Sequence, residues 1–234
     1  MTDGMTDPSG PSGHGVTHMF TLSGGHVFPL YDGATRASPP LPLIDVRHEQ
    51  TAVFAAEATA RLTRSPGLAV VTAGPGVTNS VSAVTTAHFN GAPVVVLGGR
   101  APDYRWGAGS LQEIDHPPLL APVTKRAWTE HATAQVAGSV DAAFRLAATP
   151  HRGPVFLDVS LEALYDQAAP PPFVAGAGPA GAAPDPGVVS DIASRLAQAQ
   201  RPVLVLGSDV WLDGAEDAEA PAIPLGPPAA PGAV

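Results

Sequence analysis

The chain has 234 residues, a formal net charge of −9 and a pI near 5.2, and 44% of its residues are hydrophobic, which is enough to bury a core. The acidic balance argues against nucleic acid as the main partner, because backbone phosphates require a basic surface. There is no cysteine, which excludes disulfides, thiolate metal sites and cysteine nucleophiles. Residues 1–15 lack the basic and apolar regions of a secretory signal, and no apolar run approaches the roughly 20 residues that span a bilayer. We therefore expect a cytoplasmic protein.

Short apolar runs alternate with stretches of helical periodicity from Val16 to Val159. This alternation predicts an α/β fold with a doubly wound, mostly parallel sheet flanked by helices, in which ligands bind beyond the carboxyl ends of the strands. The expected strands are 16–20, 41–46, 68–73, 93–98, 124–128 and 154–159, and the expected helices are 27–36, 48–63, one from Pro75 and 132–148. A long polar loop is expected over 99–115.

Composition divides the chain into five segments. We expect a disordered leader, one α/β domain, an Ala/Pro/Gly-rich linker, the truncated start of a second α/β domain, and a disordered tail. The second domain would begin with a helix over 188–200 and a buried strand over 202–207, which cannot close a core alone. The five segments are 1–14, 15–167, 168–187, 188–214 and 215–234.

Glu49 stands in the sequence Arg-His-Glu-Gln, where an expected strand gives way to a helix. A residue at this junction should point toward the ligand crevice. An acid near a helix N-terminus is also favoured by the helix dipole alone, so the position by itself leaves both interpretations open. It is not a zinc motif, because Ala52 occupies the place of the second histidine of H-E-x-x-H.

Two glycine-rich turns follow other expected strands. Residues 72–79 (Thr-Ala-Gly-Pro-Gly-Val-Thr-Asn) match neither a dinucleotide fingerprint nor a Walker A loop. Gly24 and Gly25 lie within the segment 20–32. Each turn alone is either a plain tight turn or a site where bare backbone approaches a ligand.

Together these clusters resemble the pyrimidine-binding N-terminal domain of thiamine diphosphate (ThDP) enzymes, in the acetolactate synthase-like or 2-hydroxyacyl-CoA lyase-like branch. The resemblance covers roughly residues 15–165 and, faintly, 186–210. The segments that carry it are 20–32 (the family's F-G-x-P-G-G…P-x-Y-D), Arg47-His48-Glu49 (its catalytic glutamate), 72–79 (T-x-G-P-G-x-x-N), and 109–113 with Thr124-Lys125 (F-Q-E…T-K).

The resemblance implies roles for six residues. Glu49 would hydrogen-bond the N1′ nitrogen of the aminopyrimidine and favour the imino form that removes the C2 proton, which requires a water-poor setting. The cofactor would be ThDP, shared with a partner domain. Pro75 and Asn79 would line the pyrimidine pocket, Gly24 and Gly25 would leave room above the thiazolium, and Gln112 would face the substrate, a small 2-oxo acid or an acyl-CoA.

Several positions depart from the family pattern. Leu111 replaces a phenylalanine, Ser23 replaces a proline, and Gly98-Gly99-Arg100 stands where many synthases have Gly-Gln-Val. No Gly-Asp-Gly motif for a Mg²⁺-bound diphosphate is present, so Mg²⁺ would bind only through a domain that this sequence lacks, and we assign no metal ligand.

Three hypotheses follow. The first is a partial or split ThDP enzyme, completed by a second copy or by a separate chain that carries the diphosphate-binding domain. The second is a non-catalytic remnant or regulatory dimerisation domain of the same family. The third is a generic nucleotide-binding α/β domain, which the missing fingerprints disfavour.

Overall fold

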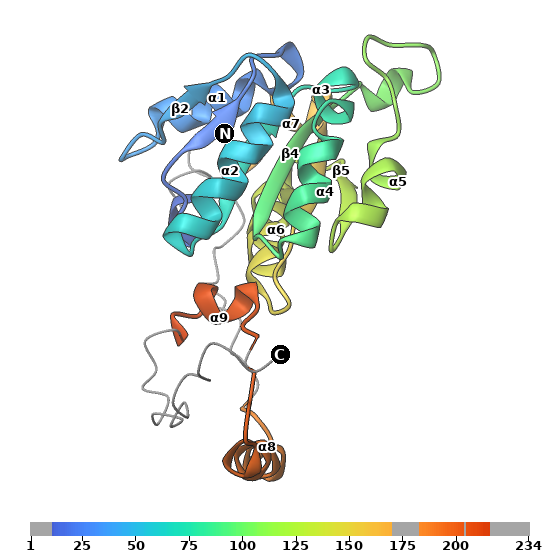
Figure 1. Ribbon diagram of the computed structural model, residues 1–234. Coiled ribbons are helices and arrows are strands. Elements are labelled where there is room, and N and C mark those ends of the chain that lie inside the picture. The colour runs from blue at the N-terminus through green and yellow to red at the C-terminus, as the bar shows by residue number, and fades with distance from the viewer. Residues whose placement is uncertain (1–10, 170–182, 204, 216–234) are drawn as a thin grey trace. The chain divides into compact units, whose positions relative to one another are not determined.

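The computed structural model describes residues 11–169, 183–203 and 205–215 (Figure 1). The chain divides into two compact units, Met1–Pro179 and Ala180–Val234, and each is described by itself. The predicted linker and tail fall largely on 170–182 and 216–234, outside the described residues. Within the described residues, no helix is long and apolar enough to cross a membrane.

The first unit is built on a six-stranded sheet in the order β2-β1-β3-β4-β6-β5, and every neighbouring pair is parallel. The predicted doubly wound parallel sheet is therefore confirmed. β3, β4 and β6 are buried along their whole length, as expected for central strands covered on both faces. The strands are β1 (Met19–Thr21), β2 (Leu43–Asp45), β3 (Gly67–Val71), β4 (Val94–Arg100), β5 (Ala127–Glu130) and β6 (Val155–Ser160).

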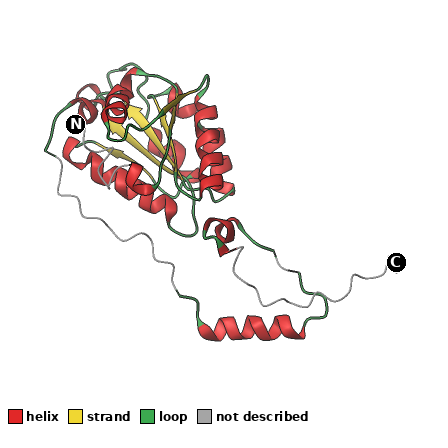
Figure 2. Ribbon diagram, turned by 90° about the vertical axis from the view of Figure 1, so that its left-hand side faces the viewer, coloured by secondary structure: helices red, strands yellow, loops and turns green. Residues whose placement is uncertain are grey.

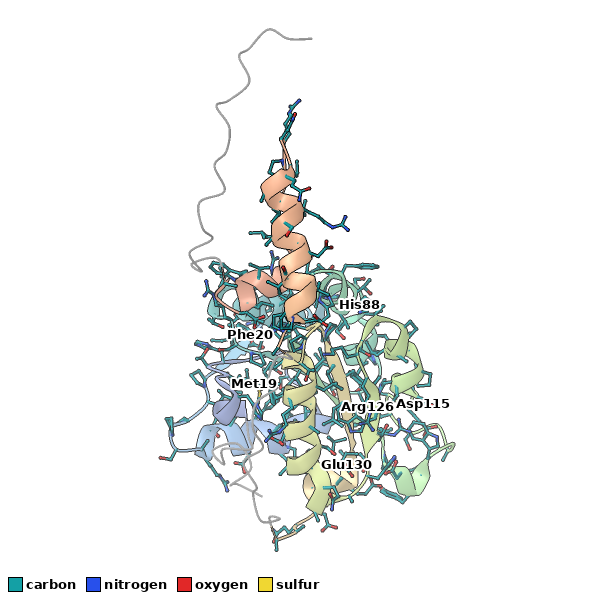
Figure 3. The ribbon with its side chains drawn as sticks, turned by 90° about the horizontal axis from the view of Figure 1, so that it is seen from below. Met19, Phe20, His88, Asp115, Arg126 and Glu130 are labelled. Carbon is teal, nitrogen blue, oxygen red and sulfur yellow. The ribbon has the colours of Figure 1, made fainter. Side chains whose placement is uncertain are left out.

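Helices cover both faces of this sheet (Figures 1 and 2). One apolar cluster joins α1, α6 and α7 to one face, and a second joins α2, α4 and α5 to the other. Met19 and Phe20, adjacent on β1 and labelled in Figure 3, belong to opposite clusters, as the alternation of side chains along a strand requires. The helices are α1 (Phe28–Arg36), α2 (Glu49–Thr63), α3 (Pro75–Thr78), α4 (Val81–Phe89), α5 (His116–Leu120), α6 (Val136–Ala148) and α7 (Leu161–Tyr165).

Short 3-10 turns complete the unit, at Pro11–His14, Gly25–Val27, Asp103–Arg105, Ala121–Val123 and Thr133–Gln135. Disorder was expected through residue 14, and the first of these turns occupies the last residues of that predicted leader. The His14 ring stacks on Phe144 of α6, and its Nε2 lies 3.0 Å from Asp141 Oδ1. These contacts offset the cost of ordering the end of the leader.

Three other elements differ from expectation. The first strand starts at Met19, because Met19 is the first residue whose backbone pairs with both β2 and β3. β4 runs through Arg100 into the expected loop. The helix expected from Pro75 is interrupted after Thr78, and a new helix starts at Val81.

The second unit contains α8 (Pro186–Gln198) and α9 (Ser208–Leu212). Asp185 caps α8, since its Oδ1 accepts from the backbone N–H of Gly187 and Val188. The strand expected over 202–207 does not form at the described residues of that segment, where Val203 and Val205 are 84% and 87% exposed. A parallel strand requires a paired neighbour, and the described residues of this unit contain none.

Candidate functional site

Glu49 is the first residue of α2 and lies just beyond the end of β2. Its side chain is only 8% exposed. His48 caps the helix, because its Nδ1 accepts from the Gln50 N–H at 3.2 Å. Asn79 Nδ2 donates to Glu49 Oε2 at 3.0 Å, so two of the predicted residues, 30 positions apart, are in direct contact.

The Gly-Pro-Gly turn connects β3 to α3. Gly74 has φ 59° and ψ −114°, a conformation that side chains rarely adopt, and a Cβ there would lie 2.8 Å from Gln112 Cβ. Pro75 opens α3, where its missing N–H costs nothing. Asn79 ends the same short helix. Pro75 and Asn79 are both exposed, and Asn79 contacts the buried Glu49 carboxylate.

Thr72 is the residue on which the two glycine turns meet. A Cβ on Gly24 would lie 2.3 Å from Thr72 Cβ, and a Cβ on Gly76 would lie 2.7 Å from Thr72 Cγ2. Thr72 Oγ1 also lies 3.3 Å from His26 Nδ1 and 3.4 Å from Gln112 Oε1. Gly24 is therefore needed for close packing, whereas a Cβ on Gly25 would meet no atom within 4 Å.

A pocket of about 580 Å³ opens at the carboxyl ends of β1 and β3. Of the predicted residues, Gly24, Gly25 and Gln112 line this pocket, whereas Glu49, Pro75 and Asn79 are not among its described lining residues. The other lining residues are Ser23, His26, Thr72, Leu111, Leu161, Glu162 and Tyr165. The structure thus gathers the six predicted residues into two groups on the same edge of the sheet.

Several polar groups in this pocket are already engaged. Tyr165 Oη donates to the Gly25 carbonyl at 2.8 Å. The Glu162 carboxylate accepts from the backbone N–H of Asp103 at 3.1 Å and of Tyr104 at 3.2 Å. These bonds tie the loop after β4 and the start of α7 to the pocket wall.

His26 is the titratable base of the pocket. Burial lowers the pKa of His26 below its ordinary value, while a bond to the Leu111 backbone opposes this shift. The imidazole is therefore neutral at neutral pH, when it is able both to donate and to accept a hydrogen bond.

Sequence reasoning missed Glu162 and Tyr165 and assigned no role to His26. Glu162 is the second residue after β6, so the rule that sites lie at the carboxyl ends of strands could have found it. His116, which is fully buried and bonded to the Gly-Pro-Gly turn, carries no local sequence signal. Over the described residues, no group of three or more His, Cys, Asp or Glu side chains could hold a metal ion.

Residues 12–119 match the model for the thiamine pyrophosphate enzyme, N-terminal TPP binding domain. The chain belongs to the thiamine pyrophosphate (ThDP) enzyme family, of which it carries this N-terminal domain. A "Probable acetolactate synthase" of Mycobacterium bovis is 45% identical over 206 residues, covering 87% of this chain and 37% of that protein. A "2-hydroxyacyl-CoA lyase 2" of Bos taurus is 42% identical over 152 residues, covering 65% of this chain and 24% of that protein.

The crystal structure of benzoylformate decarboxylase from Polynucleobacter necessarius superimposes with a TM-score of 0.80 at 22% identity, over 92% of this chain and 40% of that chain. At this identity the match shows the shared fold alone. The ThDP-family chain therefore spans less than two fifths of the curated relatives quoted above.

The described residues fit one half of ThDP. A buried carboxylate on a helix N-terminus, next to an exposed Pro-Gly turn, suits a ring with a basic nitrogen. Bare backbone at Gly25 leaves space beside the pocket. A diphosphate requires cationic partners or a metal, and the pocket lining contains neither Lys nor Arg. The fit is to the aminopyrimidine end of the cofactor.

Proposed function

We propose that this chain is the pyrimidine-binding part of a ThDP-dependent, acetolactate synthase-like carboligase or lyase that acts on 2-oxo acids or 2-hydroxyacyl-CoA. The observation that carries the proposal is the bond between Asn79 and the buried Glu49 at the sheet edge that also bears the pocket. The two named relatives support the acyl chemistry, as a synthase and a lyase of this family.

Glu49 is the residue that transfers a proton to and from the cofactor ring. Its Oε2 accepts from Asn79, which holds the carboxylate in one orientation and leaves Oε1 for the N1′ nitrogen of the cofactor ring. A carboxyl group at this place would hold the ring at N1′ and exchange a proton with that nitrogen. When bound, ThDP supplies the carbanion-stabilising chemistry, and the protein supplies placement and exclusion of water.

The pocket is the substrate side of the site. Gln112 offers an amide to a carbonyl or carboxylate oxygen, and His26 offers a neutral imidazole. Gly24 and Gly25 keep the floor free of side chains where the reacting end of the cofactor would lie.

The diphosphate would be held, through Mg²⁺, by residues outside those described, in a separate chain that carries the diphosphate-binding domain. The match to the Mycobacterium bovis protein covers 87% of this chain, so it extends beyond the first compact unit, which ends at Pro179. This continuity supports our interpretation of α8 and α9 as the beginning of a second domain of the enzyme.

Replacement of Glu49 by Gln tests the proton role. With the chain joined to or mixed with a diphosphate-binding domain of this family, Glu49→Gln should slow C2–H exchange of ThDP in D₂O by about 10²–10⁴-fold, because the acid that activates the ring is lost. Glu57→Gln is the matched control, since Glu57 is an equally buried acid on α2 that bonds Asn90 instead. Exchange at the wild-type rate in Glu49→Gln would rule out the role.

Calorimetry on the chain alone tests the division of the cofactor site. We expect ThDP with Mg²⁺ to bind near millimolar, about −4 kcal/mol, because a few ring contacts worth about 0.5–1.5 kcal/mol each must offset the ordering of a flexible anion. The net charge of −9 adds repulsion. Micromolar, Mg²⁺-dependent binding would mean that this chain has its own diphosphate site.

A further inference from the structure

A histidine–aspartate pair lies fully buried beneath the Gly-Pro-Gly turn. His116 and Asp158 are both 0% exposed, and His116 Nδ1 lies 2.8 Å from Asp158 Oδ2. On the other side of the ring, the Gly74 backbone N–H donates to His116 Nε2 at 2.9 Å. Since Nε2 accepts, it carries no proton, and the ring proton is on Nδ1, directed at the carboxylate.

The rest of the surroundings are consistent with a neutral imidazole. Arg100 Nη1 lies 3.5 Å from the same Asp158 oxygen, so the buried carboxylate has a cationic partner without a charged His116. Phe156 meets the imidazole edge-on. Asp158 is fixed by the sheet, because it lies on β6 in register with Gly98 of β4. The pair therefore links a central strand to the turn after β3.

That turn reaches both groups of candidate site residues. On the pocket side, the Cβ position of Gly74 lies within 3.0 Å of Gln112 Cα, and Gln112 itself has φ 62°. On the other side, Gly74 is the residue before α3, whose end carries Asn79 and so the bond to Glu49. Gly74 itself donates its backbone N–H to a buried side chain, that of His116.

We propose that His116, held in the Nδ1–H form by Asp158, is a positioning residue that fixes the Gly74 turn and, through it, Gln112 and Asn79. This inference rests on the proposed function for what the positioned residues do. His116 is not among the residues that line the pocket, and its printed hydrogen bonds go to Gly74 and Asp158, so we place its effect on the site at the turn. Without this bond, the buried Gly74 N–H would have no acceptor. The turn would then shift toward a conformation in which this N–H finds an acceptor.

The first test uses the unmodified chain with ¹⁵N-labelled histidine. We expect the NMR signals of His116 to show a protonated Nδ1, an unprotonated Nε2, and a correlation across the hydrogen bond between Nε2 and the Gly74 amide. A ring protonated at Nε2, or at both nitrogens, would overturn the proposal. This measurement needs no bound cofactor, so its failure is distinguishable from a failure of the role proposed for Glu49.

The second test is a pair of variants that separates the two hydrogen bonds of the His116 ring, to Asp158 and to Gly74. Asn at 116 can donate to Asp158 but cannot reach Gly74, whereas Gln places an oxygen near the position of Nε2. We expect amide exchange of Gly74 to accelerate roughly tenfold or more in His116→Asn, as for loss of one hydrogen bond worth about 1.4 kcal/mol. In His116→Gln it should stay within a few-fold of wild type.

The same spectra report on the site. The side-chain amide of Asn79 and the backbone amide of Gln112 should shift in His116→Asn and return toward wild-type positions in His116→Gln. The Gly67 amide, bonded to the Pro93 carbonyl at the opposite end of β3, is the internal control and should not change. Identical behaviour of Asn79 and Gln112 in both variants would reduce His116 to a packing residue and overturn the proposal. If neither variant folds, the tautomer of the unmodified chain decides.

Discussion

Two almost identical hexapeptides differ in structure and burial in this molecule. Pro-Val-Val-Val-Leu-Gly at 93–98 and Pro-Val-Leu-Val-Leu-Gly at 202–207 differ at a single position. The first lies almost entirely within β4, between β3 and β6, and Val94, Val95 and Val96 are 0% exposed. In the second, Val203 and Val205 are more than 80% exposed and have no strand partner among the described residues.

Strand formation therefore depends on the neighbouring strands and helices. Apolar, β-branched residues favour a pleated and covered surface, but they gain burial only when other strands and helices supply that surface. α8 shows the same dependence, because none of its described side chains is buried, although Val188, Val189 and Ile192 lie on it. These apolar residues are exposed in the described part of the second unit.

A charge placed at the same position of each hexapeptide tests this contrast most severely. Val94→Asp should destabilise the first unit by roughly 3–5 kcal/mol, because an unpaired carboxylate would be buried between the sheet and the helices on one of its faces. Val203→Asp should change its stability by less than about 0.5 kcal/mol. Urea unfolding followed by circular dichroism measures both. A Val203→Asp effect as large as that of Val94→Asp would show that 202–207 is buried after all.

A smaller effect should separate two adjacent glycines in the packed unit. Gly24→Ala should cost about 1–3 kcal/mol, because its Cβ would overlap Thr72. Gly25→Ala should be nearly neutral, because its Cβ would enter open space. Thermal unfolding of both variants provides the comparison. Equal losses would mean that backbone freedom, and not contact with Thr72, accounts for the glycine at 24.

The smallest expected effect concerns pH. Burial lowers the pKa of His26, so the folded state resists a proton that the unfolded chain accepts near pH 6.5. Stability from this group is fully present above about pH 6.5 and falls as the pH drops below it. The Tm of His26→Gln should therefore fall less between pH 7 and pH 5.5 than the Tm of the parent chain. His88→Gln, at an exposed histidine, is the control and should match the parent.

The sheet was predictable because its signals are local and redundant. Short apolar runs such as residues 68–71 (Leu-Ala-Val-Val) predict buried strands without knowledge of the partner. β4 extends to Arg100 because that guanidinium finds Asp115 and Asp158, which are distant in sequence. α5 and α7 are only five residues long and are stabilised mainly by the core beneath them, so periodicity could not reveal them.

The residues of the candidate site likewise fall into those that the sequence could reveal and those that it could not. Glu49, Asn79 and the glycine turns stand in recognisable order along the chain, and resemblance alone was enough to single them out. His116 and Asp158 are 42 residues apart and match no motif, although their contact with the turn is direct. Their relation exists only once β6 and β3 lie on opposite sides of β4. Such contacts depend on the order of strands, which local sequence does not contain.

The packing around Thr72 has a consequence for how this domain can diverge. A single branched side chain sets the spacing of two glycines that belong to turns about fifty residues apart. A bulkier residue at either glycine could be accommodated only with a smaller one at 72, and loss of the Thr72 methyl would leave a gap against Gly76. The stability effects of substitutions at Gly24, Thr72 and Gly76 are therefore non-additive. Larger residues at either glycine will be tolerated when Thr72 has been replaced first.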